Sequence, residues 1–339
     1  MSLPTKGRAV QIVEPGRFEI VEIPVPEPAP DEVLIEVEAC STCTNWELCM
    51  WEGRDIFARP GHPRYPLNPG APGHEAAGHV VARGAEVREV CEGDLVAVKP
   101  SLRGHENDTH ATHIVRPESE VAMVGSHVSA EEAAVLEMAM CALRSVELAE
   151  EHWRTTGVGR EDGGLEGAAC VIVGLGPAGI LHVQAARLAG ATAVVGIDTL
   201  ESRRLQAKPF ADAVFAPEDE ALGGFLAPHD RRIVIECSGN AAAMALAVAL
   251  ARGAVHVFGV PEGRWVYDQS AWSSGAAILP YHWRGRPQAP LLKRAAQLLS
   301  EGKLDTACLI SAVLPYERYA EGLEKLKRRE ALKIIFRWE

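Results

Sequence analysis

The sequence predicts an α/β protein of two domains, one a barrel-like domain of antiparallel strands and the other a doubly wound parallel sheet. Three observations support this fold class. The chain has 339 residues, which is too long for one compact core of typical size. Short strand-like runs separated by Pro and Gly fill roughly the first 120 residues. From Cys170 onward, apolar strands instead alternate with helical patterns.

The antiparallel domain is predicted from four strand-like segments: Arg17–Ile23, Glu32–Glu38, His79–Ala82 and Leu95–Val98. A helix is expected over Ala133–Leu148, because Ser129 and Glu132 have the spacing of a capping box. This helix is expected to lead out of the first domain. Residues 154–167 are rich in glycine and charge, which indicates an exposed loop.

The parallel sheet is predicted from four apolar segments: Cys170–Val173, Ala193–Ile197, Ile233–Glu236 and Val255–Gly259. Continuous apolar strands separated by helices are typical of a sheet that helices cover on both faces. The remainder of the chain is expected to contain helices at Pro290–Ser300 and Tyr316–Arg329, followed by a strand at Lys333–Phe336.

Charge and composition argue against some classes of binding partner and cellular location. The formal charge is −12, and the basic residues form no large cluster, which argues against nucleic acid and anionic membranes. The longest aliphatic run, Ala241–Ala251, is well short of the roughly 20 residues of a membrane span. The first residues lack the apolar stretch of a signal peptide. We therefore expect a cytoplasmic protein whose eight cysteines are thiols or metal ligands rather than disulfides.

A glycine-rich motif lies where the first parallel strand ends. Gly174, Gly176 and Gly179 form GxGxxG, and Pro177 begins an Ala-rich helix. The first glycine permits a tight turn, the second allows a pyrophosphate to approach the backbone, and the third allows the helix and strand to pack closely. The amino terminus of the helix then faces the pyrophosphate. The motif predicts a dinucleotide site.

The charged residues after the next strand bear on the choice of cofactor. Asp198 ends that strand, 19 residues after Gly179, where a carboxylate accepts hydrogen bonds from the adenosine ribose. It would repel a 2′-phosphate, which favours NAD(H). Arg203 and Arg204 lie nearby and keep NADP(H) open, with Arg203 as a candidate contact to the cofactor.

Four residues of the first domain are candidate metal ligands. A thiolate, an imidazole and carboxylates, from Cys43, His74, Glu75 and Glu137, form a donor set suited to zinc. Glu137 interrupts an apolar run in which an unpaired carboxylate is costly to bury. The alternatives are a small buried cysteine, a hydrogen-bonded loop histidine and an exposed helix glutamate. His105, His110 and His113 form a separate group that also fits a plain strand.

Together these residues resemble the zinc-dependent medium-chain dehydrogenase/reductase superfamily, which includes alcohol, sorbitol and threonine dehydrogenases. The resemblance implies a GroES-like catalytic domain of residues 1–143 and 285–339, with a Rossmann domain of residues 144–284 inserted in it. It rests on the strand entering Cys43, Gly73-His74-Glu75, Gly93-Asp94, Leu136-Glu137, the glycine motif, Glu236-Cys237-Ser238-Gly239 and Lys333-Ile334-Ile335.

The resemblance also implies roles. Cys43 and His74 would bind zinc directly, while Glu75 and Glu137 would share the remaining contribution, directly or through water. Glutamate at position 137 resembles the polyol dehydrogenases, since alcohol dehydrogenases usually have cysteine there. The backbone of Val260 would face the nicotinamide. No cysteine lies between Cys91 and Cys141, so we expect one catalytic zinc and no structural zinc.

The chain departs from the family after Cys43. Asn45 stands where the family commonly has the hydroxyl residue of a proton relay, so Thr44, water or Glu75 would carry the proton instead. Trp46 replaces the aspartate that supports a zinc ligand, and Glu47 is the alternative for that role.

The resulting hypothesis is a zinc-dependent, NAD(H)-linked oxidoreductase that acts on a secondary alcohol, polyol or sugar alcohol and its ketone. One alternative is a zinc-free enoyl or quinone reductase of the same fold. Another is an NAD(H)-binding protein without catalysis. Relatives extend their Rossmann sheets edge to edge, so we expect a homodimer or homotetramer in which residues 276–279 supply the edge.

Overall fold

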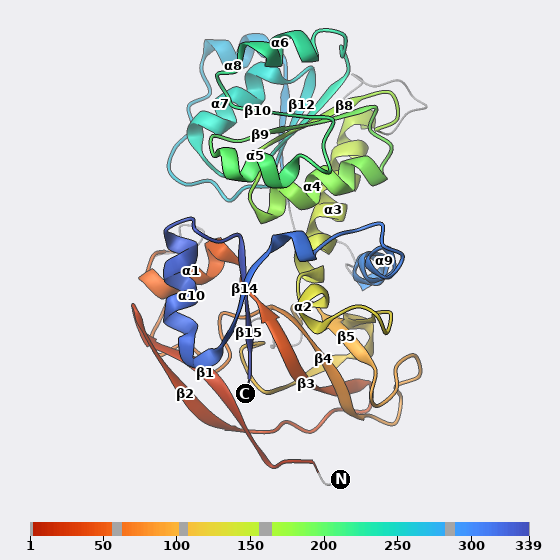
Figure 1. Cartoon of the computed structure of the whole chain (residues 1–339), viewed down its shortest axis with the longest axis vertical. Coiled ribbons are helices and arrows are strands. Elements are labelled where there is room, and N and C mark those ends of the chain that lie inside the picture. The colour runs from red at the N-terminus through yellow and green to blue at the C-terminus, as the bar shows by residue number, and fades with distance from the viewer. Residues whose placement is uncertain (1–2, 56–62, 102–107, 156–164, 282–288, 339) are drawn as a thin grey trace. The chain divides into compact units, whose positions relative to one another are not determined.

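The computed structural model describes residues 3–55, 63–101, 108–155, 165–281 and 289–338 (Figure 1). It divides into two compact units. The first contains residues 1–140 and 287–339, and the second contains residues 141–286. The expected boundaries, at 143/144 and 284/285, lie within a few residues of these positions. The predicted fold class is confirmed, since one unit is a mostly antiparallel β structure and the other is a parallel α/β sheet.

The first unit is built on a seven-stranded sheet in the order β14-β15-β3-β4-β5-β7, with β6 also paired to β3. All of its pairs are antiparallel except β14 with β15. A separate hairpin joins β1 and β2. The strands are β1 (Lys6–Glu14), β2 (Arg17–Pro24), β3 (Glu32–Ser41), β4 (Glu75–Arg83), β5 (Leu95–Val98), β6 (His113–Pro117), β7 (Val121–Met123), β14 (Ile310–Pro315) and β15 (Lys333–Arg337).

Strand β15 lies between β14 and β3, so the last strand of the chain sits inside a sheet made mainly from its first third. Its residues Ile334, Ile335 and Phe336 are fully buried. The helices of this unit are α1 (Thr44–Glu52), α2 (Ala130–Ala133), α9 (Ala289–Ser300) and α10 (Tyr319–Lys327), with 3₁₀ turns at Glu118–Glu120, Ala307–Leu309 and Tyr316–Arg318.

The helix expected at Ala133–Leu148 is interrupted. The capping box forms, because the Ser129 hydroxyl accepts from the Glu132 amide and the Glu132 carboxylate accepts from the Ser129 amide. Helix α2 nevertheless ends at Ala133, and α3 (Leu136–Thr155) begins after a turn. In that turn the Val135 amide donates to a carbonyl only three residues back, at 3.3 Å, which tightens the chain. The break places Glu137 in the first turn of α3.

The second unit contains a six-stranded sheet in the order β10-β9-β8-β11-β12-β13, and every pair is parallel. The strands are β8 (Ala169–Val173), β9 (Ala193–Ile197), β10 (Ala213–Phe215), β11 (Arg232–Glu236), β12 (Gly253–Val257) and β13 (Ala277–Pro280). The chain moves outward from β8 to β10 and then returns to β11 beside β8. That reversal creates a switch point at the carboxyl end of β8, where such sheets bind nucleotides.

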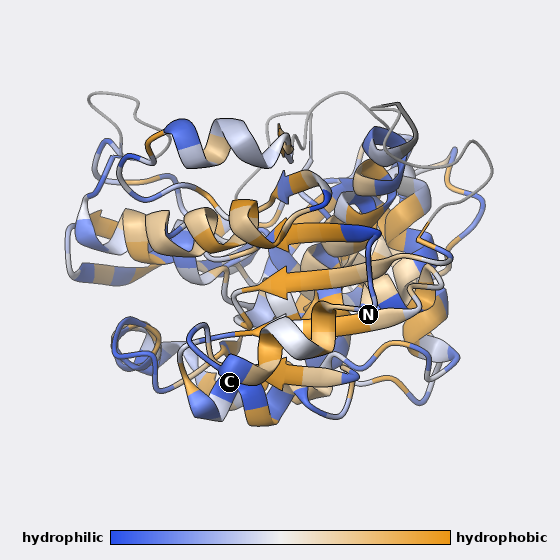
Figure 2. Cartoon of the chain, turned by 90° about the horizontal axis from the view of Figure 1, so that it is seen from above, coloured by the Kyte–Doolittle hydropathy of each residue, from blue (hydrophilic) through white to orange (hydrophobic). Residues whose placement is uncertain are grey.

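Helices α4 (Pro177–Leu188), α5 (Glu201–Ala207), α6 (Glu220–Leu226), α7 (Ala241–Leu250) and α8 (Gln269–Ser274) connect these strands. The residues of β8, β9 and β11 are buried throughout, as expected for a sheet covered on both faces. In Figure 2 the strands are mainly hydrophobic, while hydrophilic residues gather on helices and loops. Among the described residues, none of the helices has the length and apolar character needed to cross a membrane.

Candidate metal centre and dinucleotide site

Cys43 lies where β3 gives way to α1. Beyond Ser41, the Thr42 amide donates to the Ile334 carbonyl at 3.1 Å, and the Thr42 hydroxyl accepts from the Ile334 amide at 3.0 Å. Cys43 is the N-cap of α1. The helix ends at Gly53, whose φ of 69° is the left-handed conformation that glycine adopts most easily. Cys43 is thus held between a tethered strand end and a short helix.

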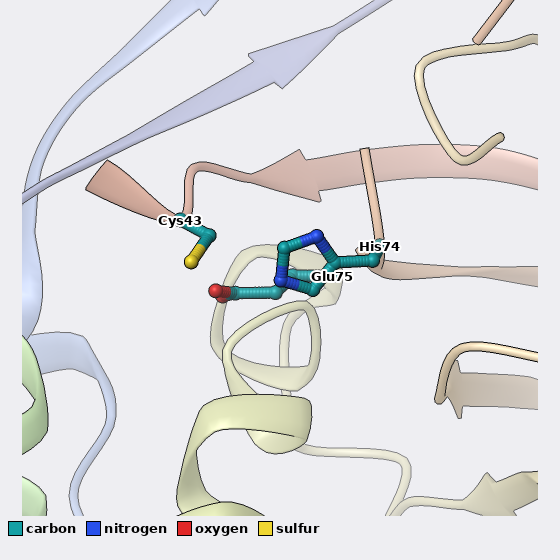
Figure 3. Close-up of side chains that lie close together, drawn as sticks. All are labelled: Cys43, His74 and Glu75. Atoms are coloured by element: carbon teal, nitrogen blue, oxygen red, sulfur yellow. The ribbon is translucent and has the colours of Figure 1, made fainter. Parts of the chain in front are cut away.

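Strand pairing brings the second ligand segment to Cys43. Strand β4 begins at Glu75, which lies opposite Ser41 in the antiparallel register. The Cys43 Sγ, a His74 ring nitrogen and a Glu75 carboxylate oxygen all lie within 4.8 Å of one another. Figure 3 shows the sulfur and the carboxylate pointing toward each other beside the imidazole ring. Three of the four predicted ligands therefore form one cluster.

The ring orientation of His74 suits a metal ligand. Its Nδ1 lies 3.1 Å from the Pro72 carbonyl oxygen, an acceptor, so Nδ1 donates a proton there and Nε2 is the nitrogen available to a metal. Burial lowers the pKa of His74, but the Cys43 sulfur, followed by the carboxylates of Glu137 and Glu75, raises it well above 6.5. Without a metal, this concentration of negative charge retains a proton that a cation would displace.

Glu75 is fully buried, and only one of its two carboxylate oxygens has a partner among the described residues. Its Oε2 forms an ion pair with the buried Lys333 ammonium, which also donates to the Thr42 carbonyl at 2.7 Å. Its Oε1 has no hydrogen-bond partner among the described residues. A buried carboxylate oxygen without a partner is costly, and a cation beside Cys43 and His74 would satisfy it. The residues present therefore fit zinc.

Glu137 is placed near this cluster but not in it. It is 7% exposed at the start of α3, and its charge acts on His74. None of its oxygens lies within 4.8 Å of all three cluster atoms, so the structure assembles three donors with a fourth carboxylate close by.

The side chains of Thr44 and Asn45 form hydrogen bonds with groups outside the cluster, which is not the arrangement of a proton relay. The Thr44 hydroxyl donates to the Leu332 carbonyl at 3.3 Å. The Asn45 side-chain oxygen accepts from the Cys49 thiol at 3.5 Å. The Trp46 ring stands edge-on to the His74 ring, with centroids 6.3 Å apart. Trp46 thus forms an aromatic wall at the metal cluster.

Glu47 does not support a zinc ligand directly, so that alternative is wrong. Its carboxylate binds His110, whereas Nδ1 of His74 binds the Pro72 carbonyl.

Sequence reasoning assigned no role to Lys333 or to His110. The signal for Lys333 was a charged residue at the start of an apolar strand. His113 starts β6, and His105 lies outside the described residues.

The glycine motif has the geometry of a dinucleotide loop. Gly174 has a φ of 93°, and a Cβ on Gly179 would lie 1.8 Å from the Gly174 carbonyl oxygen. Gly176 is the N-cap of α4 and Pro177 its first residue. The Arg203 guanidinium lies 2.8 Å from the point that a Gly176 Cβ would occupy. Glycine is required at positions 174 and 179, and the Arg203 cation lies beside the loop at Gly176.

Asp198 and Val260, the residues predicted to face the two ends of the cofactor, lie at the carboxyl ends of strands. Asp198 follows β9, and its two oxygens accept from the Leu175 amide at 2.7 Å and the Leu200 amide at 2.8 Å. This ties the carboxylate to the glycine loop. Val260 follows β12 and is 39% exposed. Its carbonyl packs so closely on Gly239 that a Cβ there would lie 2.0 Å from the oxygen.

Comparison with known proteins gives consistent findings. Residues 29–171 match the alcohol dehydrogenase GroES-like domain, and residues 177–290 match the zinc-binding dehydrogenase family. An L-threonine 3-dehydrogenase from Bacillus subtilis is 27% identical over 344 residues, covering 93% of this chain and 94% of the relative.

Two crystal structures share the fold. Galactitol-1-phosphate dehydrogenase from Escherichia coli has a TM-score of 0.79 and 21% identity, covering 97% of this chain and 99% of its own. An NADP-bound protein from Sinorhizobium meliloti 1021, described as a zinc-binding dehydrogenase, has a TM-score of 0.78 and 24% identity, covering 98% of this chain and 100% of its own.

Proposed function

Because the chain belongs to the zinc-dependent medium-chain dehydrogenase/reductase superfamily, we propose that it transfers hydride between a nicotinamide dinucleotide and a secondary alcohol or polyol and its ketone. The observation that carries this proposal is the unpartnered Glu75 Oε1 beside Cys43 and His74. It gives the GroES-like unit a place for a cation. The glycine loop supplies the dinucleotide site that such an enzyme also needs.

In the proposed site, Cys43 and His74 would hold zinc, and Glu75 and Glu137 would contribute directly or through water. Zinc bound there would supply Lewis-acid polarisation of an alcohol or carbonyl oxygen. Lys333 fixes one Glu75 oxygen and leaves the other toward the cluster. The Pro72 carbonyl sets the tautomer of His74.

Proton transfer needs a group other than residue 45, because an amide side chain cannot act as a hydroxyl relay. Thr44 keeps its lone pairs while its proton is directed to Leu332, so its oxygen can accept but not readily donate. We therefore assign the proton path to Glu75 or water, with Thr44 as an acceptor. The Trp46 wall favours a substrate with an apolar portion near the reacting carbon.

For the cofactor, we propose NAD(H) over NADP(H). The Asp198 carboxylate is fixed by two backbone amides at the end of β9, where it would face a 2′-phosphate. Arg203 beside Gly176 supports the opposite choice. The ratio of kcat/KM with NAD and with NADP distinguishes the two.

We further propose one zinc per chain, a cytoplasmic location and a homodimer or homotetramer. Strand β13 supports the assembly, because it forms the edge of the parallel sheet and pairs only with β12 among the described strands. A second copy could continue the sheet there.

The deciding experiment is the zinc content per chain of protein purified without chelator, with Cys43→Ala as the control. About one zinc in the parent that is lost in the variant supports the proposal and justifies a polyol screen with NAD. Zinc near zero in both, even after metal is supplied, refutes it. That result would favour the second candidate, a zinc-free reductase, because the Lys333 ammonium already balances the Glu75 charge without a metal.

A further inference from the structure

A buried chain of hydrogen bonds lies outside the proposed metal cluster. The Glu47 carboxylate forms an ion pair with His110, whose Nε2 lies 2.6 Å from the Glu47 Oε1. On the other side of the ring, Nδ1 lies 3.0 Å from the Tyr316 hydroxyl oxygen. All three side chains are at most 1% exposed. Both ring nitrogens are therefore engaged, and the ring has one fixed orientation.

His110 contacts both segments that carry the proposed zinc ligands. Through Glu47 it holds α1, in which the Glu47 amide donates to the Cys43 carbonyl at 2.9 Å. Its backbone amide donates to the Gly70 carbonyl at 3.1 Å. A Cβ on Gly73, the residue before His74, would lie 2.8 Å from the His110 Cδ2. His110 thus bridges the two segments: its side chain holds α1 through Glu47, and its backbone amide holds the chain just before His74.

The bridge is a charged one. Burial lowers the pKa of His110, but the Cys40 sulfur and the Glu47 carboxylate raise it to about 10, so the ring is an imidazolium at neutral pH. The Glu47 Oε2 has no partner among the described residues. His110 is thus the cation that compensates Glu47, and rotating α1 away would leave a buried carboxylate alone.

We propose that the Glu47–His110 pair, fixed at its far end by Tyr316, is a positioning device that sets the separation of Cys43 and His74 before metal binds. His110 is not one of the three clustered donors. It acts through α1 and through the loop at Gly73. The inference rests on the proposed zinc site. It adds two residues, Glu47 and His110, that lie outside the metal cluster.

The test measures the zinc affinity of the full-length, metal-free protein by competition with a chromophoric chelator. Glu47→Gln keeps the shape of the side chain and removes its charge. Tyr316→Phe removes one hydroxyl and keeps the ring. The matched control is Glu120→Gln, since Glu120 forms a buried ion pair with Lys99 in the same unit, at 3.1 Å. Thermal unfolding of each variant reports stability separately.

We expect Glu47→Gln to weaken zinc binding about tenfold, which is the low end of the loss caused by removing a group bonded directly to a metal ligand, because Glu47 acts through α1. Tyr316→Phe should weaken it by a smaller factor, and Glu120→Gln should leave it within about twofold of the parent. In the cobalt-substituted protein, the absorption bands of Glu47→Gln should shift, because they report the geometry of the thiolate and imidazole ligands. A double variant, Glu47→Leu with His110→Phe, should regain stability but not zinc affinity.

Parent-like zinc affinity and an unshifted cobalt spectrum in Glu47→Gln would overturn the positioning role while leaving the zinc site intact. So would a loss in Glu120→Gln as large as that in Glu47→Gln, because zinc binding would then merely follow stability. A parent protein that binds no zinc would overturn the proposed function itself, and this inference with it.

Discussion

Lys333→Met tests the buried ion pair that supports the proposed metal cluster. The ammonium of Lys333 contacts the Glu75 carboxylate and the Thr42 carbonyl, and both partners are fully buried. Methionine fills a similar volume but leaves the carboxylate without a counter-charge. Removing one partner of a buried pair costs about 3–5 kcal/mol, against a total stability of about 5–15 kcal/mol.

The assay is urea unfolding of the metal-free protein, followed by tryptophan fluorescence, with and without added zinc. Without zinc, the variant should lose about 3–5 kcal/mol of unfolding free energy. With zinc, part of this loss should be recovered, because the cation replaces Lys333 as the counter-charge of Glu75. The double variant Lys333→Met with Glu75→Gln should be less destabilised than Lys333→Met alone, since no buried charge remains.

Two results would refute this reasoning. A metal-free Lys333→Met protein that unfolds within about 1 kcal/mol of the parent would show that the pair is solvated or dispensable. A double variant as unstable as the single one would show that the loss comes from packing rather than from an unpaired charge.

Three further predictions concern the second unit. Burial lowers the pKa of His182 to about 4, and burial, with smaller contributions from His182, His152 and Arg144, lowers that of His256 to about 3, so both are neutral when folded. Below about pH 6.5 the unfolded chain binds more protons than the folded one, so the stability present above that pH is lost as the pH falls. Between pH 7 and pH 5 the loss should be about 2 kcal/mol per histidine, measured by urea titrations at the two pH values. Equal stability at both would contradict this. Gly179→Ala should weaken NADH binding more than tenfold by fluorescence titration, because its Cβ would meet a carbonyl oxygen at 1.8 Å, whereas Gly223→Ala in α6, where nothing lies within 4 Å, should bind NADH like the parent. Asp198→Ala should shift the ratio of kcat/KM for NAD over NADP about tenfold toward NADP, and an unchanged ratio would show that this carboxylate does not select the cofactor.

Local patterns predicted most of the secondary structure, because strands and Gly turns leave short-range signals. They did not predict α1, whose residues Thr44–Glu52 have no strong helical face of apolar residues. That helix is closed at its carboxyl end by Gly53 in the left-handed conformation, and its Glu47 carboxylate is fixed by an ion pair with His110, which lies far away in the sequence. The break after Ala133 was also missed, since the Ala-rich sequence favours a continuous helix.

Motif resemblance brought Cys43, His74 and Glu75 together, and the strand register of β3 and β4 explains why. The supporting residues could not be found in this way. Lys333 is 258 residues from Glu75 and His110 is 63 residues from Glu47. Such pairings depend on which strands become neighbours in the folded sheet, and no short stretch of sequence encodes that.

The position of β15 between β14 and β3 has a consequence for biosynthesis. Ile334 pairs with Thr42 across 292 residues, and Lys333 reaches Glu75 from the same strand. While the ribosome is still making the second unit, the nascent first unit exposes the edge of β3 and an uncompensated Glu75. The strand that supplies the Lys333 counter-charge of Glu75 therefore joins the sheet only after the whole second unit has been made.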